Sequence, residues 1–134
     1  MNALLHQPWL RTALLVGAVY LVIGRIFTLP SSNVHLWRIV AWFLSGVAFI
    51  VHMKYELWWL RNSPRVSAVH VALGVAIGAA ALALAGMVYN LSTGSGLRPA
   101  WLLALALWPA ITAIPAFLVA LGTGALLARL RPGT

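Results

Sequence analysis

The chain has 134 residues, of which 63% are hydrophobic and only 7% are charged. A soluble domain carries about 25% charged residues, because water must solvate its surface. The net charge of +8 arises from nine basic residues and one acid, and the basic residues are scattered singly. This pattern excludes the clustered basic face of a nucleic-acid-binding protein, and the absence of cysteine excludes disulfides and thiolate chemistry. Lipid is therefore the expected solvent.

Four apolar stretches are long enough to cross a bilayer, whose core needs about 20 residues of helix. The expected spans cover about residues 12–29, 37–60, 64–89 and 99–127. Pro109 and Pro115 interrupt the last span and predict a kinked helix, since proline removes a backbone donor. The sequence thus predicts an all-α, integral membrane four-helix bundle, with residues 1–134 as a single transmembrane domain.

The basic residues indicate the orientation of this bundle. Both ends of the chain and the connection between the second and third spans fall on one side, which carries Arg11, Arg61, Arg65, Arg129 and Arg131. The other side carries Arg25, Arg38 and Arg98. By the positive-inside rule, both termini are expected in the cytoplasm, and we expect a bacterial inner membrane. Most tryptophans, including Trp9 and Trp37, fall at predicted span ends, where aromatic residues anchor helices at the interface.

The segment "RNSPR" predicts a tight antiparallel hairpin between the second and third spans. Ser63 is suited to cap the third helix, and Pro64 is suited to its first position, where no backbone donor is needed. The third span also carries a stripe of small residues, and in lipid such residues let helix backbones approach closely. The stripe consists of Gly74, Gly78, Ala81 and Ala85. It predicts either packing within one subunit or a face for a homo-oligomer.

Glu56 is the only acidic residue, and it lies inside an apolar span. Residues equally distant from a turn at 62–63 share one depth, which pairs Glu56 with His70. His52 precedes Glu56 by four residues and therefore lies on the same helical face. A charged residue at the centre of a membrane helix costs about 2.5–3.5 kcal/mol, so Glu56 needs such partners. The sequence predicts a buried polar cluster of Glu56, His52 and His70, with Tyr55 close by.

Three roles are open for this cluster. It could be a polar clasp that fixes the hairpin, or a proton relay, since histidine titrates near neutrality and ionisable residues inside membranes are often functional. It could also ligate a cofactor, such as haem or a chlorophyll-type pigment, through His52 or His70. No metal site is expected, because one carboxylate and two histidines lack a recognisable zinc-ligand spacing.

The remaining charges predict contacts with lipid or another anion. Arg25 and Arg38 are expected at similar depth across the first hairpin, with no protein carboxylate beside them, so a lipid phosphate is the expected partner. Lys54 can extend to the headgroups and contact Trp58. The full set of expected lipid or anion contacts is Arg25, Arg38, Lys54, Arg61 and Arg65.

The single acid excludes several classes of function. A Ser-His-Asp site or a pair of carboxylates cannot be assembled, so an enzyme is not expected, and a cation channel would need further acids or a carbonyl filter. The favoured prediction is an accessory or structural subunit of a larger membrane complex, in contact with a pigment, haem, quinone or lipid. The alternatives are a small dimeric proton-coupled transporter that uses Glu56, and a lipid-binding membrane protein.

Overall fold

The protein is all-helical over the described residues, which in this computed structural model are 7–29, 32–94, 96 and 99–130. The four long helices are α2 (Pro8–Ile26), α3 (Val34–Lys54), α4 (Pro64–Ser92) and α5 (Pro99–Arg129). A π-helix of one turn, η1 (Tyr55–Trp59), continues α3. All four are long and apolar enough to cross a membrane. The α2 helix begins at Pro8, earlier than predicted, because proline fits the first helical turn.

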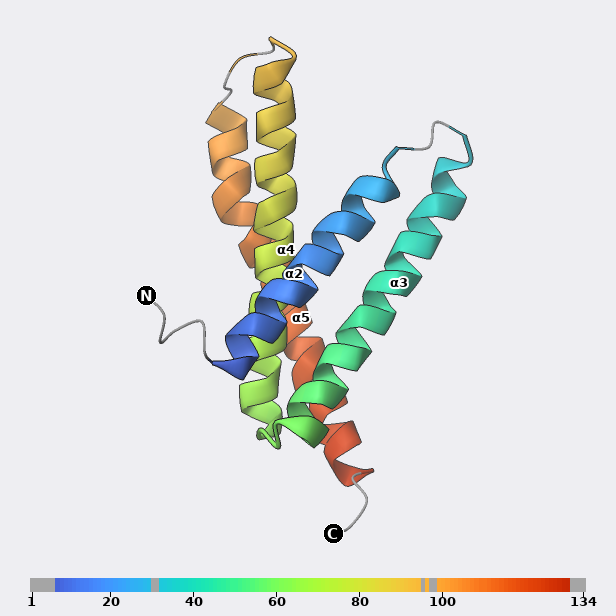
Figure 1. Ribbon diagram of the computed structural model, residues 1–134, viewed down its shortest axis with the longest axis vertical. Coiled ribbons are helices and arrows are strands. Elements are labelled where there is room, and N and C mark those ends of the chain that lie inside the picture. Colours follow the sequence, from blue (N-terminus) through green and yellow to red (C-terminus); the bar gives the residue numbers. More distant parts are fainter. Residues whose placement is uncertain (1–6, 30–31, 95, 97–98, 131–134) are drawn as a thin grey trace.

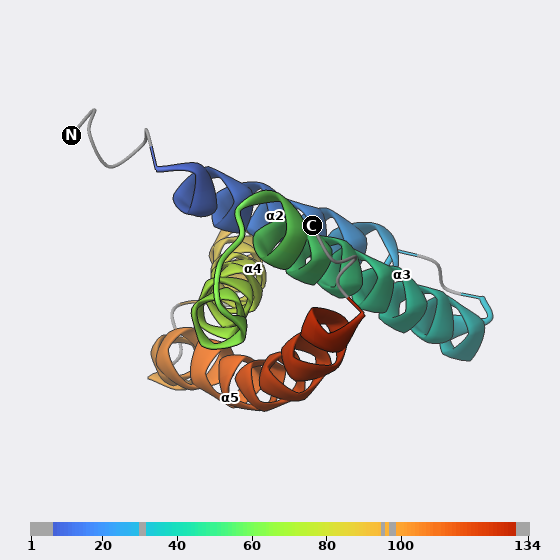
Figure 2. The ribbon, with the colours of Figure 1, turned by 90° about the horizontal axis from the view of Figure 1, so that it is seen from below.

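The helices form two antiparallel pairs that lean apart. In Figure 1, α4 and α5 run side by side, while α2 and α3 diverge from them toward the upper end. The start of α2, the connection at residues 60–63 and the end of α5 lie toward the lower end. Figure 2 shows that α5 curves, and Pro109 and Pro115 lie within it, as predicted for this helix. The Thr112 hydroxyl donates to the carbonyl of Trp108 at 2.9 Å, a bond that also favours bending.

Glycines allow α2 and α4 to cross in close contact. A Cβ atom on Gly78 would lie 2.6 Å from the Tyr20 Cβ and 3.2 Å from the Gly17 carbonyl oxygen. A Cβ on Gly17 would lie 2.6 Å from the Ile77 side chain. Gly74 and Gly78 thus pack against α2 of the same chain, which is the first of the two roles predicted for the small-residue stripe.

The second and third predicted spans do not pack along their lengths. The connection between η1 and α4 is short, and Ser63 caps α4 as predicted, its hydroxyl accepting from the Val66 amide at 3.4 Å. Beyond this connection, however, α3 and α4 diverge (Figure 1). The glycine face of α4 is occupied by α2, and α5 packs along another side, so α3 meets α4 only near the connection.

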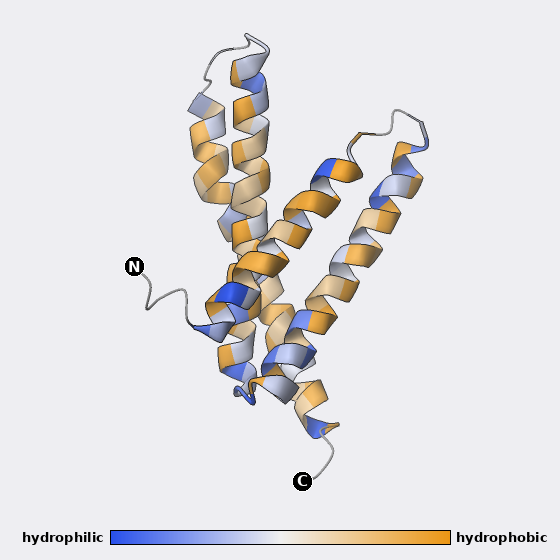
Figure 3. Ribbon diagram, in the orientation of Figure 1, coloured by the Kyte–Doolittle hydropathy of each residue, from blue (hydrophilic) through white to orange (hydrophobic). Residues whose placement is uncertain are grey.

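The buried hydrophobic core lies where these elements converge. It consists of Met53, Leu57, Ala68, Val71 and Ala120, from the end of α3, η1, the start of α4 and the second half of α5. Elsewhere, large apolar side chains are exposed, and Trp42 on α3 is 82% exposed. Figure 3 shows hydrophobic residues along the helices and hydrophilic ones mainly toward the helix ends. Such a surface fits a lipid environment.

The glycine crossing yields a test with a matched control. Gly78→Ala should lower the free energy of unfolding by about 1–3 kcal/mol, because the new methyl group overpacks the crossing against Tyr20 and the Gly17 backbone. Gly46→Ala on α3 meets nothing within 4 Å and should be neutral or stabilising, since alanine favours helix. Denaturant titration in detergent, followed by circular dichroism, compares the two variants. Equal effects would contradict the close crossing.

Candidate functional site

Glu56 lies fully buried in η1, with 0% of its surface exposed. One carboxylate oxygen, Oε2, accepts a hydrogen bond from Asn62 Nδ2 at 2.7 Å and lies 2.7 Å from His70 Nδ1. A carboxylate only accepts hydrogen bonds, so His70 carries the proton on Nδ1 when Glu56 is ionised. Two strong hydrogen bonds therefore converge on one oxygen, from the connection and from α4.

The local backbone brings Asn62 back to Glu56. The Leu60 amide donates to the Tyr55 carbonyl at 3.1 Å, which makes the wider π-turn, and Arg61 adopts a left-handed conformation with a φ of 54°. The chain consequently reverses, and the Asn62 amide donates to the Glu56 carbonyl at 3.0 Å. Asn62 thus bonds both the backbone and the side chain of Glu56, so the helix end and the site form one unit. Turns of this π type occur frequently at functional sites.

His52 lies on the other side of the carboxylate. Its Nε2 atom is 3.7 Å from Glu56 Oε1, too long for a hydrogen bond, and the side chain is fully buried. The imidazole packs on Gly74, where an added Cβ would lie 3.3 Å from His52 Cε1. Gly74 therefore has a second role beyond the α2 crossing, because its lack of a side chain leaves room for the histidine ring.

In the polar network, Glu56 Oε2 has hydrogen-bond partners, whereas Glu56 Oε1 and the His52 ring nitrogens have none in the described part of the chain. Among the described residues, four buried side-chain atoms have no hydrogen-bond partner: Glu56 Oε1, both ring nitrogens of His52, and Ser67 Oγ. A buried polar atom without a partner costs about 1–3 kcal/mol, so such atoms are rare and call for an explanation. The bonds to Oε2 hold the helices together, and they leave the unsatisfied atoms on the Oε1 side unexplained.

Trp9 covers the outer side of the network. Its ring stacks on His70 with 4.7 Å between centroids and 13° between planes. His70 is 14% exposed, whereas Glu56 and His52 are enclosed. His70 is therefore the member of the network nearest the surface, and Trp9 lies on the face of its ring.

The other predicted site residues lie outside this network. Tyr55 stacks instead on Trp59, with 6.5 Å between ring centroids. The Lys54 amine lies 4.6 Å from the centre of the Trp58 ring, which confirms that predicted contact. Arg61 and Arg65 are exposed around the connection.

The two arginines of the predicted Arg25–Arg38 pair have different surroundings, and their shared contact with a lipid phosphate stays a prediction. Arg25 lines a pocket between α2 and α4, together with Ala81 and Ala85 of the small-residue stripe. Arg38 is exposed on α3 and is not part of that pocket. Arg98, on the same predicted side, lies outside the described residues.

The geometry gives little support to a shared metal or haem. Over the described part of the chain, no group of three or more His, Cys, Asp or Glu side chains could hold a metal ion. The two histidines point at the two oxygens of one carboxylate. Two axial haem ligands would instead face each other across a flat ring.

Comparisons with known proteins do not assign the chain to a family. No family model matches it, and neither a curated protein nor a solved structure shows significant similarity. The function must therefore be argued from the site itself.

Sequence reasoning missed two residues of the site. Asn62 was assigned only to the turn, and Trp9 only to the membrane interface. The pairing of Trp9 with His70 depends on which helix crosses α4, and that information is absent from local sequence. Asn62 was the easier of the two to predict from the sequence, because an asparagine at a helix end often bonds nearby groups.

Removing His70 should destabilise the protein, whereas removing an exposed histidine should not. His70→Ala leaves the buried Glu56 carboxylate with Asn62 as its remaining donor, and we expect a loss of about 3 kcal/mol in the free energy of unfolding. His35→Ala removes an exposed imidazole from α3 and should leave stability unchanged. Denaturant titration of both variants in detergent measures the difference. A similar small effect for both would contradict a strong Glu56–His70 interaction.

Proposed function

We propose that the protein is a small proton-coupled membrane carrier in which Glu56 binds and releases the coupling proton. In this proposal the chain spans a bacterial inner membrane four times, with both termini in the cytoplasm. His70 connects Glu56 to the aqueous side, and His52 extends the site inward.

The observation that carries this proposal is the unsatisfied half of the polar network. Glu56 Oε1 and His52 are buried side by side without hydrogen-bond partners among the described residues. A proton shared between these groups, with a small movement of the imidazole toward the carboxylate, would give both of them a hydrogen-bond partner. A purely structural contact would be expected to satisfy both oxygens of a buried carboxylate.

The shape of the molecule offers a means of coupling. The α2–α3 and α4–α5 pairs meet around the network and lean apart at the other end (Figure 1). The glycine crossing between α2 and α4 lies between these two ends, and in this proposal it is the contact about which the two pairs pivot. In the proposed mechanism, a change in the protonation of Glu56 alters the bonds at the closed end and thereby the separation at the open end.

Infrared titration provides the direct test of proton binding. Glu56 is the only side-chain carboxyl in the chain, so a carboxylic-acid band that appears on acidification and is absent from Glu56→Gln belongs to this residue. We expect this band to appear reversibly while the protein stays folded. Gln can still accept the Asn62 hydrogen bond, so the variant should retain its helicity. A carboxylate that remains ionised until the protein unfolds would overturn the proposal.

Distance measurements test the coupling. The chain lacks cysteine, so Leu36→Cys on α3 and Leu103→Cys on α5 introduce two unique, exposed label sites near the diverging ends. We expect the distance between spin labels to change with pH, and the same pair in the Glu56→Gln background to be insensitive. A distance that responds equally in both backgrounds would show that Glu56 does not control the separation.

A second candidate function is the accessory subunit, and α3 is the observation that favours it. Large side chains are exposed along this helix, and Trp42 and Phe43 are 82% and 70% exposed. Such a face suits lateral contact with partner helices as well as lipid. If the protein is a subunit, extraction into polymer discs should yield a stoichiometric complex with a defined partner, and Trp42→Ala with Phe43→Ala should weaken it. A discrete particle containing this chain alone would favour the carrier.

A further inference from the structure

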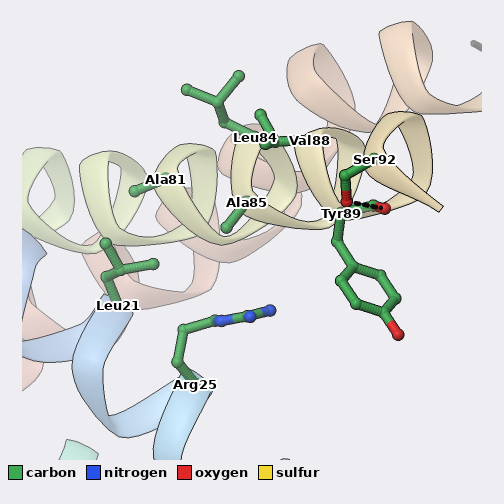
Figure 4. Close-up of a pocket in the computed structure, with 8 residues that line it drawn as sticks. All are labelled: Leu21, Arg25, Ala81, Leu84, Ala85, Val88, Tyr89 and Ser92. Carbon is green, nitrogen blue, oxygen red and sulfur yellow. Dashed lines mark hydrogen bonds between the residues drawn. The ribbon is translucent and has the colours of Figure 1, made fainter.

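A pocket of about 540 Å³ lies between α2 and α4, away from the Glu56 network. The two helices are in contact at Gly24, where an added Cβ would lie 2.7 Å from the Leu82 side chain. Beyond this contact the two helices separate (Figure 1), and the pocket is lined by side chains from both of them (Figure 4). Its lining consists of Leu21, Arg25, Ala81, Leu84, Ala85, Val88, Tyr89 and Ser92.

No acidic side chain lies in the pocket with Arg25. Figure 4 shows its guanidinium extending from α2 past Ala85, on the side of α4 where the Tyr89 ring projects. The only acidic side chain is Glu56, whose Oε2 already bonds His70 and Asn62 in the other region of the molecule. An anion that pairs with Arg25 must therefore come from outside this chain's side chains.

The pocket combines this cation with an apolar wall. The small side chains of Ala81 and Ala85 leave room on the α4 side of the pocket. Leu21 adds an aliphatic surface from α2. Tyr89 and Ser92 add hydroxyl groups near the end of α4, and the Ser92 hydroxyl donates to the Tyr89 carbonyl at 2.8 Å. One end of the pocket thus suits an anionic oxygen group, while the rest suits a hydrocarbon chain.

We infer that this pocket binds a phospholipid with a net negative headgroup. The Arg25 guanidinium holds the phosphate oxygens through paired, charge-assisted hydrogen bonds, and an acyl chain lies over Ala81, Ala85 and Leu21. The site differs from the earlier expectation of a lipid held by Arg25 and Arg38 together. It is independent of the proposed proton chemistry, and it would remain if Glu56 proved to be purely structural.

A lipid fits the pocket better than a soluble anion does. A free phosphate ion would contact one arginine in an exposed position, and single exposed ion pairs contribute little to affinity. A lipid is held beside the pocket by the bilayer itself, and its acyl chain adds close packing against the α2–α4 wall. The small size of Ala85 is essential in this arrangement, because a larger side chain would occupy the space beside Arg25.

The experiment measures lipid retention on the purified full-length protein by native mass spectrometry. The probes are phosphatidylglycerol and phosphatidylcholine with identical acyl chains, and inorganic phosphate as a competitor. Arg25→Gln should reduce phosphatidylglycerol affinity about tenfold, the size expected for loss of charged hydrogen bonds. Ala85→Phe should reduce it with every charge retained. Arg38→Gln makes the same change of charge outside the pocket and should leave the affinity within twofold of wild type.

Each outcome bears on the inference. Preference for phosphatidylglycerol that is lost in Arg25→Gln and Ala85→Phe but kept in Arg38→Gln supports the site. Equal losses in the two arginine variants would show a general effect of charge and overturn it. Full displacement by millimolar phosphate would assign Arg25 to a soluble anion, and equal retention of phosphatidylcholine would exclude charge selection. Circular dichroism checks that each variant is folded, and Ala85→Phe provides the test if Arg25→Gln is not.

Discussion

The structure depends on the need to accommodate one carboxylate in an apolar chain. Burial of Glu56 requires donors at close range, and Asn62 and His70 supply them at 2.7 Å each. These two contacts tie together η1, the connection and the start of α4. The π-turn and the left-handed Arg61 are the local backbone features that bring Asn62 back to the carboxylate. The contacts of a single carboxylate thus hold together the connection between η1 and α4.

The glycine crossing between α2 and α4 is the second constraint, and it acts through steric contact between helix backbones. Glycines at 17, 74 and 78 allow the two backbones to approach, and Gly74 also makes room for His52. The crossing therefore connects helix packing to the polar network, since a larger residue at Gly74 would press on the histidine ring. Because the crossing holds only part of each helix, the remaining lengths diverge and leave the pocket beside Arg25.

These two constraints separate the molecule into regions with different chemistry. The region around Glu56 is closed and polar, and half of its network lacks hydrogen-bond partners among the described residues, which motivates the proposed exchange of a proton. The region around Arg25 is open and amphipathic, which motivates the proposed lipid site. The long exposed face of α3 belongs to neither region, and it is the surface available to lipid or to another subunit.

The sequence by itself determined the features that depend on composition or on neighbouring residues. Four apolar helices, the Ser63 cap, the Lys54–Trp58 contact and the shared face of His52 and Glu56 follow from hydropathy, helical spacing and short-range geometry. Proximity to a turn also placed His70 opposite Glu56. Only the tertiary structure decided that α2 crosses α4, that α3 diverges from α4, and that Trp9 covers His70. In a chain where nearly every helical face is apolar, hydropathy cannot distinguish one neighbour from another, so close steric fit between distant residues makes that choice.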